Sequence, residues 1–144
     1  MKIIIASDHA GYSLKEKVKL SYEADWIDIG CHSADVSCSY SEYARKTAQK
    51  LLQGEVKKAI LICGTGIGMS MAANRFKGIR AALCVNAKMA EMSRLHNDAN
   101  VLCLGARLID EKMALDITMT WLNTEFEGGR HIPRIKLMDE DTYV

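Results

Sequence analysis

Short, continuous apolar runs recur along the chain, each bounded by polar residues or glycine. The first, "KIIIA" at 2–6, is rich in β-branched side chains, a composition typical of a buried strand. Because its apolar residues do not alternate with polar ones, both faces of this strand should be covered. Five such strands are predicted, at 2–6, 26–30, 59–63, 79–85 and 100–106.

The segments between these runs show the spacing of amphipathic helices. Leu14, Val18 and Tyr22 recur at intervals of four residues, as one face of a helix requires. The only proline, Pro133, lies beyond the last segment of this kind. Helices are predicted at 12–22, 43–52, 66–76, 87–95 and 110–126, and the second should bury Ala44, Ala48, Leu51 and Leu52.

Strands that alternate with helices predict a parallel sheet whose connections are right-handed crossovers. The expected fold is a three-layer α/β, Rossmann-like fold, in which a five-stranded parallel sheet carries helices on both faces. We expect residues 1–144 to form one domain, whose carboxyl end is a tail. Ligands of such folds bind at the carboxyl ends of the strands. Asp8, His9 and Cys63 each follow a predicted strand, so they could share one cleft.

Composition excludes several classes of function. Of the 144 residues, 49% are hydrophobic and 26% are charged, and the formal net charge is only +1, so neither nucleic acid nor a membrane surface is expected as a partner. No 18-residue apolar run and no signal peptide are recognisable, and a cytoplasmic location is expected. The five cysteines are widely spaced without a CxxC pair, which predicts neither a disulfide framework nor a metal site.

The stretch "CGTGIGMS" at 63–70 joins the third predicted strand to a helix and carries the strongest chemical signal. It lacks the residues of a Walker loop, a dinucleotide fingerprint or a Cys-x5-Arg phosphatase loop. A cysteine that faces a helix amino terminus has its thiolate favoured, which lowers its pKa. Gly64, Gly66 and Gly68 allow backbone N–H groups to point at a negative charge. A buried cysteine in a tight turn is the structural alternative.

Other polar motifs have a plain structural interpretation beside a functional one. "SDHAG" at 7–11 could simply cap a helix, and His96 could interact with the dipole at a helix end. Arg130 and Arg134 in "EGGRHIPRI" would lie within one turn if that segment is helical, a workable clamp for phosphate. The alternative for this segment is a solvated surface.

Four segments together resemble one family of sugar-phosphate isomerases. "SDHAG", "ILICGTGIGMSMAANRFKGIRAA", "SRLHNDANVLCLGAR" and "EGGRHIPRI" occur in that family's order, and the similarity runs from residue 2 to about 135. The family contains ribose-5-phosphate isomerase B and the two subunits of galactose-6-phosphate isomerase. The resemblance implies an aldose–ketose isomerase of ribose 5-phosphate and ribulose 5-phosphate, in the pentose phosphate pathway, without metal or cofactor. A six-carbon sugar phosphate is the alternative substrate, and a non-catalytic sugar-phosphate sensor is the alternative function.

The same resemblance implies roles for individual residues. Cys63 would be the base, Thr65 would assist hydroxyl proton transfer, and His96 would open the sugar ring. The remaining residues would bind substrate: Asp8 and Asn97 the hydroxyls, the loop residues Gly64, Gly66, Ile67 and Gly68 the enediolate oxygen, and His9, Arg107, Arg130 and Arg134 the phosphate.

Two further expectations concern assembly and a departure from the family. The tail beyond Gly129 carries apolar residues, Ile132, Ile135 and Leu137, that a single chain has no obvious core left to bury. We therefore expect a homodimer or homotetramer in which the site is shared between chains. Where many relatives have Asp-Tyr-Pro after the second strand, this chain has "SYS" at 39–41, so the shape of that loop is not predicted.

Overall fold

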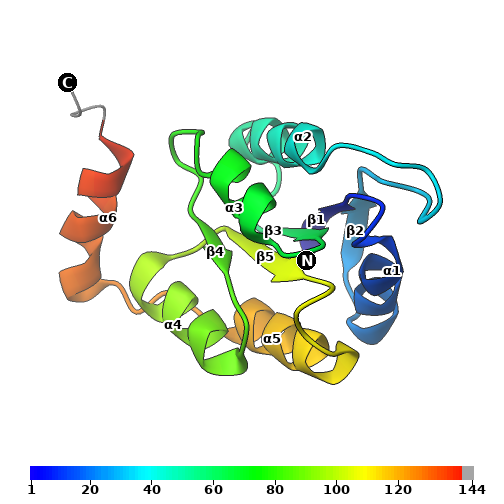
Figure 1. Ribbon diagram of the computed structural model, residues 1–144. Helices are drawn as coiled ribbons and strands as arrows, with labels where there is room; N and C mark the ends of the chain where they lie inside the picture. Colours follow the sequence, from blue (N-terminus) through cyan, green and yellow to red (C-terminus); the bar gives the residue numbers. More distant parts are fainter. Residues whose placement is uncertain (141–144) are drawn as a thin grey trace.

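The structure, a computed structural model that describes residues 1–140, contains a five-stranded sheet in the order β2-β1-β3-β5-β4. Every neighbouring pair of strands is parallel. The predicted Rossmann-like arrangement is thus confirmed, and all five predicted strands are present (Figure 1). Their bounds are β1 Lys2–Ser7, β2 Asp25–Asp28, β3 Ala59–Cys63, β4 Ala81–Leu83 and β5 Val101–Gly105.

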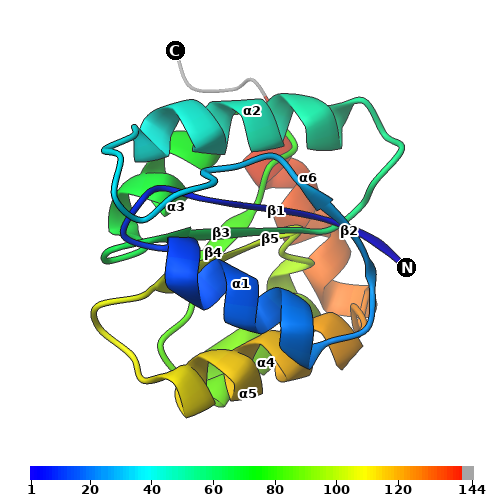
Figure 2. The ribbon, with the colours of Figure 1, turned by 90° about the vertical axis from the view of Figure 1, so that its right-hand side faces the viewer.

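Helices cover both faces of the sheet, as predicted. The views along and across the sheet show α2 and α3 on one face and α1, α4 and α5 on the other (Figures 1 and 2). Their bounds are α1 Tyr12–Ser21, α2 Tyr40–Leu52, α3 Ile67–Ala73, α4 Ala87–Asn97 and α5 Glu111–Asn123. The prediction was wrong for Leu52, which is 51% exposed because it lies at the last turn of α2, past the edge of the core.

The first strand explains why the apolar runs are continuous. Ile3 and Ile5 belong to the core beneath α1, α4 and α5, whereas Ile4 and Ala6 belong to the core beneath α2 and α3. Because successive side chains of a strand point to opposite faces, a strand covered on both sides needs apolar residues at every position. Within residues 1–140, none of the helices is long and apolar enough to cross a membrane.

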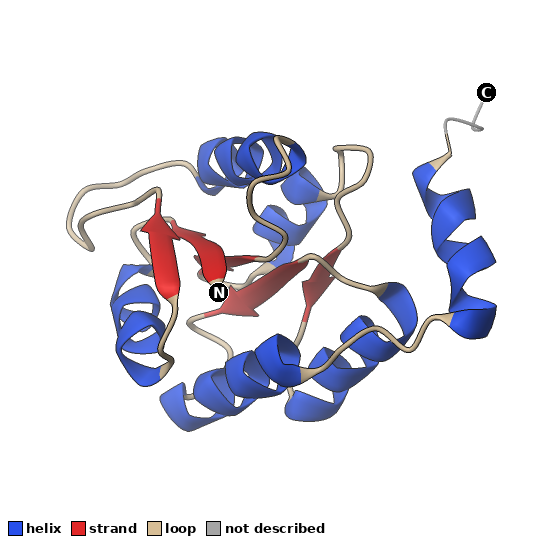
Figure 3. Ribbon diagram, turned by 180° about the vertical axis from the view of Figure 1, so that it is seen from behind, coloured by secondary structure: helices blue, strands red, loops and turns tan. Residues whose placement is uncertain are grey.

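The segment after α5 is helical, where the sequence predicts only a tail. Gly129–His131 forms a short 3-10 helix, η1, and Ile132–Asp139 forms α6, with Pro133 in its first turn, where proline is tolerated. Two views show α6 standing apart from the rest of the molecule (Figures 1 and 3). No residue of α6 is buried, and Leu137 is 56% exposed. The expectation that the apolar tail finds no core in its own chain is therefore confirmed for this segment.

A buried cation ties α1 to the loop that follows β2. The Lys15 side chain is fully buried, and its Nζ donates to Asp28 Oδ1 at 2.8 Å and to the carbonyl oxygen of Cys31 at 2.6 Å. Burial by itself would raise the pKa of Asp28, but hydrogen bonds from Lys15, Lys19 and the Gly30 N–H outweigh it and lower that pKa. This network holds the chain at 28–31 against the first βα unit, beside the ends of the central strands.

Substitution of Asp28 tests this network. Asp28→Ala leaves a buried ammonium group without its carboxylate, so we expect the free energy of unfolding at pH 7 to fall by about 3 kcal/mol. The folded-state pKa of Asp28 is lowered, so its stabilisation is complete above the ordinary carboxyl pKa and is lost as the pH falls through the folded value. Urea titrations followed by circular dichroism should show the full difference at pH 7 and a progressively smaller one as the pH is lowered below 3.8.

Asp25→Ala is the matched control, because Asp25 lies on the same strand and is exposed. Its effect should stay within about 0.5 kcal/mol. Equal losses for the two variants would contradict the structural role of the Lys15–Asp28 pair.

Candidate active site

The order of the strands defines where a ligand should bind. The chain passes from β1 outward to β2, then returns across β1 to place β3 on its other side. Such a reversal opens a crevice at the carboxyl ends of the two central strands. Ser7 at the end of β1 is in register with Ile62 of β3, so Asp8 and Cys63 both lie at this crevice. The predicted gathering of Asp8 and Cys63 is confirmed.

The loop after β3 wraps its backbone around the thiol. The N–H of Gly66 donates to Cys63 Sγ at 3.1 Å. Gly66 has a φ of +75°, and a Cβ atom there would lie 2.5 Å from Leu83 Cδ1, so glycine is required both by conformation and by space. An N–H donor stabilises negative charge on sulfur. One backbone N–H of the glycine loop therefore points at the Cys63 sulfur.

Arg107 and Thr65 lie at the same loop. The N–H of Arg107 donates to the Gly64 carbonyl at 2.9 Å, and a Cβ at Gly64 would be 3.3 Å from the Arg107 guanidinium. Thr65 is exposed, and its hydroxyl accepts the N–H of Ile67 at 3.2 Å. A cationic group and a hydroxyl therefore lie at the loop that follows Cys63, from two different segments of the chain.

The "SDHAG" motif forms the turn that leads into α1, whose N-cap residue is Gly11. The buried Asp8 carboxylate accepts the N–H of Gly11 at 3.0 Å, which organises the turn into α1. His9 Nδ1 accepts the N–H of Cys38 at 3.3 Å. Because Nδ1 is an acceptor, the proton of a neutral His9 ring sits on Nε2, which is then free to act as a donor to a ligand.

A cleft of about 400 Å³ opens at this loop, and Asp8, Cys63 and Thr65 are among its lining residues. Two of its lining residues, Tyr40 and Met71, are not among the predicted site residues. The Tyr40 ring packs on Gly68, where a Cβ atom would lie 2.5 Å from Tyr40 Cε2. Tyr40 is the middle residue of "SYS" and the only one of the three that matches the common Asp-Tyr-Pro, so this shared tyrosine was the available signal. The lining residues are Asp8, Tyr40, Cys63, Gly64, Thr65, Ile67, Gly68 and Met71.

Three of the other four cysteines are held as thiols by a raised pKa. Burial and the neighbouring Cys31 sulfur raise the pKa of Cys38 to about 11, and burial raises the pKa of Cys84 to about 11. Burial also raises the pKa of Cys103 well above its usual range. Cys31 is 5% exposed and its thiol donates to the Ser33 carbonyl at 3.0 Å. All five cysteines are free, as predicted.

The remaining predicted site residues lie at the amino ends of the strands, the opposite side of the sheet from Cys63. His96 and Asn97 end α4, immediately before β5 begins at Val101. Val101 pairs with Ala59, the first residue of β3, whereas Cys63 is the last. The length of β3 alone therefore separates these two groups by roughly 13 Å. Figure 2 shows this arrangement, with the amino terminus and α6 toward one end of the strands and the loop into α3 at the other.

His96 belongs to a small cluster with Glu127 and His131. The two imidazole rings stack with centroids 4.5 Å apart, and Glu127 Oε2 lies 3.9 Å from His96 Nε2 and 3.5 Å from His131 Nε2. The hydrogen bond from Arg130 lowers the pKa of Glu127, and burial lowers the pKa of His131. Glu127 was not predicted as a site residue. The N–H of Glu127 donates to the Leu95 carbonyl, which fixes this segment on α4.

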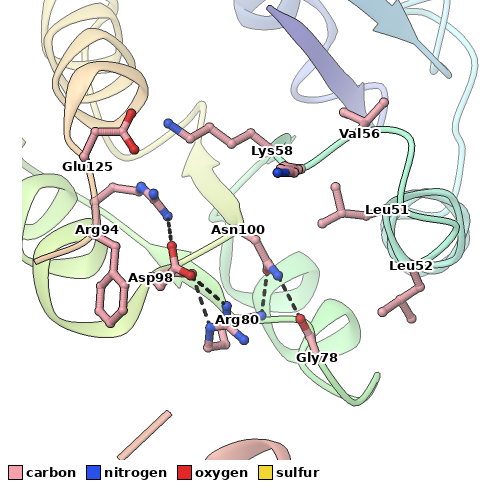
Figure 4. A pocket seen from close by; sticks show the side chains of 13 residues that line it. Leu51, Leu52, Val56, Lys58, Gly78, Arg80, Arg94, Asp98, Asn100 and Glu125 are labelled. Atoms are coloured by element: carbon pink, nitrogen blue, oxygen red, sulfur yellow. Dashed lines mark hydrogen bonds and ion pairs between the residues drawn. The ribbon is translucent and has the colours of Figure 1, made fainter. Parts of the chain in front are cut away.

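A larger cavity, about 560 Å³, also lies at the amino ends of the strands, but several of its charged side chains are already paired within the chain. Arg94 and Arg80 both pair with Asp98, and the Asn100 amide donates to the Gly78 carbonyl (Figure 4). Lys58 donates to the Leu122 carbonyl at 3.0 Å. These contacts join β4, β5 and α4, so we assign this cavity a structural role.

A thiol within a glycine loop, at the crevice of a doubly wound parallel sheet, defines an α/β enzyme site suited to moving protons through an anionic intermediate. Comparison with known proteins gives the family. The model of the ribose/galactose isomerase family matches residues 3–138, so the chain belongs to this family and is an isomerase. The resemblance on which the predictions rest is confirmed.

Individual relatives cover nearly the whole chain. Ribose-5-phosphate isomerase B of Escherichia coli is 41% identical over 138 residues, which span 94% of this chain and 92% of that protein. A solved ribose 5-phosphate isomerase of Thermotoga maritima has a TM-score of 0.92 at 50% identity, covering 96% and 97% of the two chains. The enzyme of Mycoplasma genitalium, solved with bound ribulose 5-phosphate, has a TM-score of 0.89 at 39% identity, covering 95% and 93%.

Alkylation should distinguish Cys63 from the other thiols. At pH 8 a thiol of pKa about 11 is ionised in roughly one molecule in a thousand, so Cys38 and Cys84 should react slowly with iodoacetamide. We expect Cys63, reached through the cleft, to be alkylated at least tenfold faster, as measured by peptide mass spectrometry over time. In urea all five cysteines should react at similar rates, and faster labelling of Cys38 in the folded protein would contradict this assignment.

Proposed function

We propose that the protein interconverts ribose 5-phosphate and ribulose 5-phosphate, with Cys63 as the base. The observation that carries the proposal is the hydrogen bond from the Gly66 N–H to Cys63 Sγ, inside a cleft that also contains Asp8 and Thr65. The names of the relatives support the substrate, since the Escherichia coli protein is a ribose-5-phosphate isomerase B and the Mycoplasma genitalium enzyme binds ribulose 5-phosphate.

The proton balance of the reaction suits one thiol. The Cys63 thiolate takes the proton from carbon 2 of the open-chain aldose, and the electron pair left behind gives an enediolate. The same thiol returns a proton to carbon 1, while a proton moves from the hydroxyl on carbon 2 to the oxygen on carbon 1 with the help of Thr65. Carbon 2 is oxidised as carbon 1 is reduced, so the proposed step requires neither a metal nor a redox cofactor.

The enediolate needs a donor for its negative oxygen. The N–H of Gly66 is engaged by the Cys63 sulfur and that of Ile67 by the Thr65 hydroxyl. The N–H of Gly68 comes next, in the first turn of α3, where amides have no acceptor within the helix. We therefore assign the oxyanion contact first to Gly68, with Gly64 shaping the turn. A fixed donor aimed at developing charge lowers the barrier more than it tightens substrate binding.

The proposal requires a second copy of the chain. His9 follows β1 and Arg107 lies beside Gly64, so both would bind phosphate on this side, but His96, Asn97, Arg130 and Arg134 lie at the other edge of the sheet. A partner that docks its α4–α6 edge against this cleft would add the ring-opening imidazole and two phosphate-binding arginines. The exposed apolar side chains of α6 support such docking, since a soluble chain seldom leaves them uncovered.

The direct test is an isomerisation assay on a panel of aldose phosphates, with wild type and Cys63→Ala compared. Wild type should convert ribose 5-phosphate to ribulose 5-phosphate, with a lower kcat/KM for galactose 6-phosphate and allose 6-phosphate. Cys63→Ala should lose at least 99% of its turnover but bind ribose 5-phosphate within about tenfold of wild type, because a base acts on the barrier more than on ground-state affinity.

Cys84→Ala is the matched control, since Cys84 lies outside the cleft, and it should retain most of the activity. Turnover by Cys63→Ala above a tenth of wild type would rule out the thiol as the essential base. Higher kcat/KM on a six-carbon substrate would reassign the substrate, and binding without turnover on the whole panel would indicate a sensor.

A further inference from the structure

Three side chains with metal-binding atoms converge between the end of α4 and η1. His96 and His131 each place Nε2 within 3.9 Å of Glu127 Oε2, and one ligating atom from each residue lies within 4.8 Å of the others. Ligands of a tetrahedral zinc ion, each about 2.1 Å from the metal, are separated from one another by roughly 3.4 Å. The three ligating atoms are therefore near the spacing that such an ion requires.

The buried imidazole gives an independent observation. His131 is 4% exposed, and its Nε2 is buried without a hydrogen-bond partner among the described residues, 3.5 Å from the Glu127 carboxylate. Buried polar nitrogens in folded proteins nearly always have a partner, because leaving one unsatisfied is costly. A metal ion shared with Glu127 would satisfy this nitrogen.

The carboxylate is already oriented for this purpose. Arg130 donates to Glu127 Oε1 at 3.1 Å, which leaves Oε2 as the oxygen that faces both imidazoles. A partner that holds the outer oxygen of a ligating carboxylate is a common feature of metal sites. His96 and Glu127 have side chains that are 38% and 43% exposed, so an ion can reach the cluster from solvent.

We propose that His96, Glu127 and His131 form a binding site for a borderline divalent cation of the zinc class, with solvent as the fourth ligand. Two imidazole nitrogens and one carboxylate oxygen are a ligand set that zinc accepts, and three protein ligands leave an open position. The cysteine spacing gave no indication of this site, because its ligands are histidines and a glutamate from two separate segments.

Two features of the cluster determine how binding should behave. The imidazole rings are stacked, so the partly exposed His96 ring must turn before both nitrogens can point at one ion. Arg130 and Arg134 add positive charge nearby, and both contribute to lowering the pKa of His131. The negative charge of Glu127 is then indispensable, and its removal should weaken binding more than the loss of one ligand atom would suggest.

Occupation of the site has a consequence for turnover, which rests on the proposed function. His96 is the group assigned to opening the sugar ring, and a nitrogen bound to a metal can neither give nor take a proton. Metal binding and ring opening should therefore exclude each other. The site would make the isomerase sensitive to zinc, and a chelator should restore its activity.

The experiment is a titration of the full-length protein with Co²⁺, a spectroscopic substitute for Zn²⁺, followed by competition with Zn²⁺. We expect one Co²⁺ per chain, with visible d–d bands of nitrogen and oxygen ligands and displacement by Zn²⁺. Glu127→Gln and His96→Asn should each weaken binding at least tenfold. Glu125→Gln is the matched control, since this carboxylate is exposed on the same segment but outside the cluster, and it should bind as wild type does.

Cys63→Ala separates this site from a thiolate site and should retain Co²⁺ binding. The proposal is overturned if Co²⁺ does not bind at millimolar concentration, if Glu127→Gln binds as tightly as wild type, or if Cys63→Ala abolishes binding together with thiolate charge-transfer bands. Binding as expected without inhibition of ribose 5-phosphate turnover would leave the site standing and refute only the proposed role of His96.

Discussion

All five strands of the sheet run in the same direction, and this constraint determines where every functional side chain can lie. In a parallel sheet each crossover leaves at the carboxyl edge and returns at the amino edge, so a residue at the end of a strand and one at the end of a crossover helix are held apart. Cys63 is of the first kind and His96 is of the second. The Gly66 N–H donates to the Cys63 sulfur at the carboxyl ends of the strands. Glu127 and His131 lie beside the His96 imidazole at the amino ends.

This separation links the fold to the proposed assembly. One chain contains both halves of the machinery implied by the family resemblance, but the sheet keeps them at opposite edges. A second copy is the simplest way to bring a thiol and an imidazole to the same sugar. The side of the chain that would have to dock carries Arg130 of η1. It also carries the exposed apolar side chains of α6, which are Ile132, Leu137 and Met138. Oligomerisation would then serve catalysis directly as well as covering apolar surface.

The sequence predicted the sheet well because burial on both faces leaves an unmistakable pattern, as Ile3 to Ala6 show. It also predicted that Asp8 and Cys63 share a cleft, since strand ends in a parallel sheet meet on one side. It did not predict the helical form of α6, which buries none of its own residues and so leaves little apolar periodicity. Nor did it predict Tyr40 on Gly68 or Glu127 beside two histidines, because those contacts join segments whose packing no local pattern specifies.

The central claim, that one site is built from two chains, is tested most directly by mixing inactive variants. Cys63→Ala and His96→Asn, unfolded and refolded together in equal amounts, should recover about a quarter of wild-type activity, since half of the dimers are hybrids with one intact site each. Cys63→Ala mixed with Asp8→Ala is the control. Both residues belong to the cleft that one chain contributes to each site, so neither site of a hybrid dimer is intact. Recovery only in the first mixture is the predicted result. No recovery, when mass measurement shows that hybrids have formed, would contradict the claim.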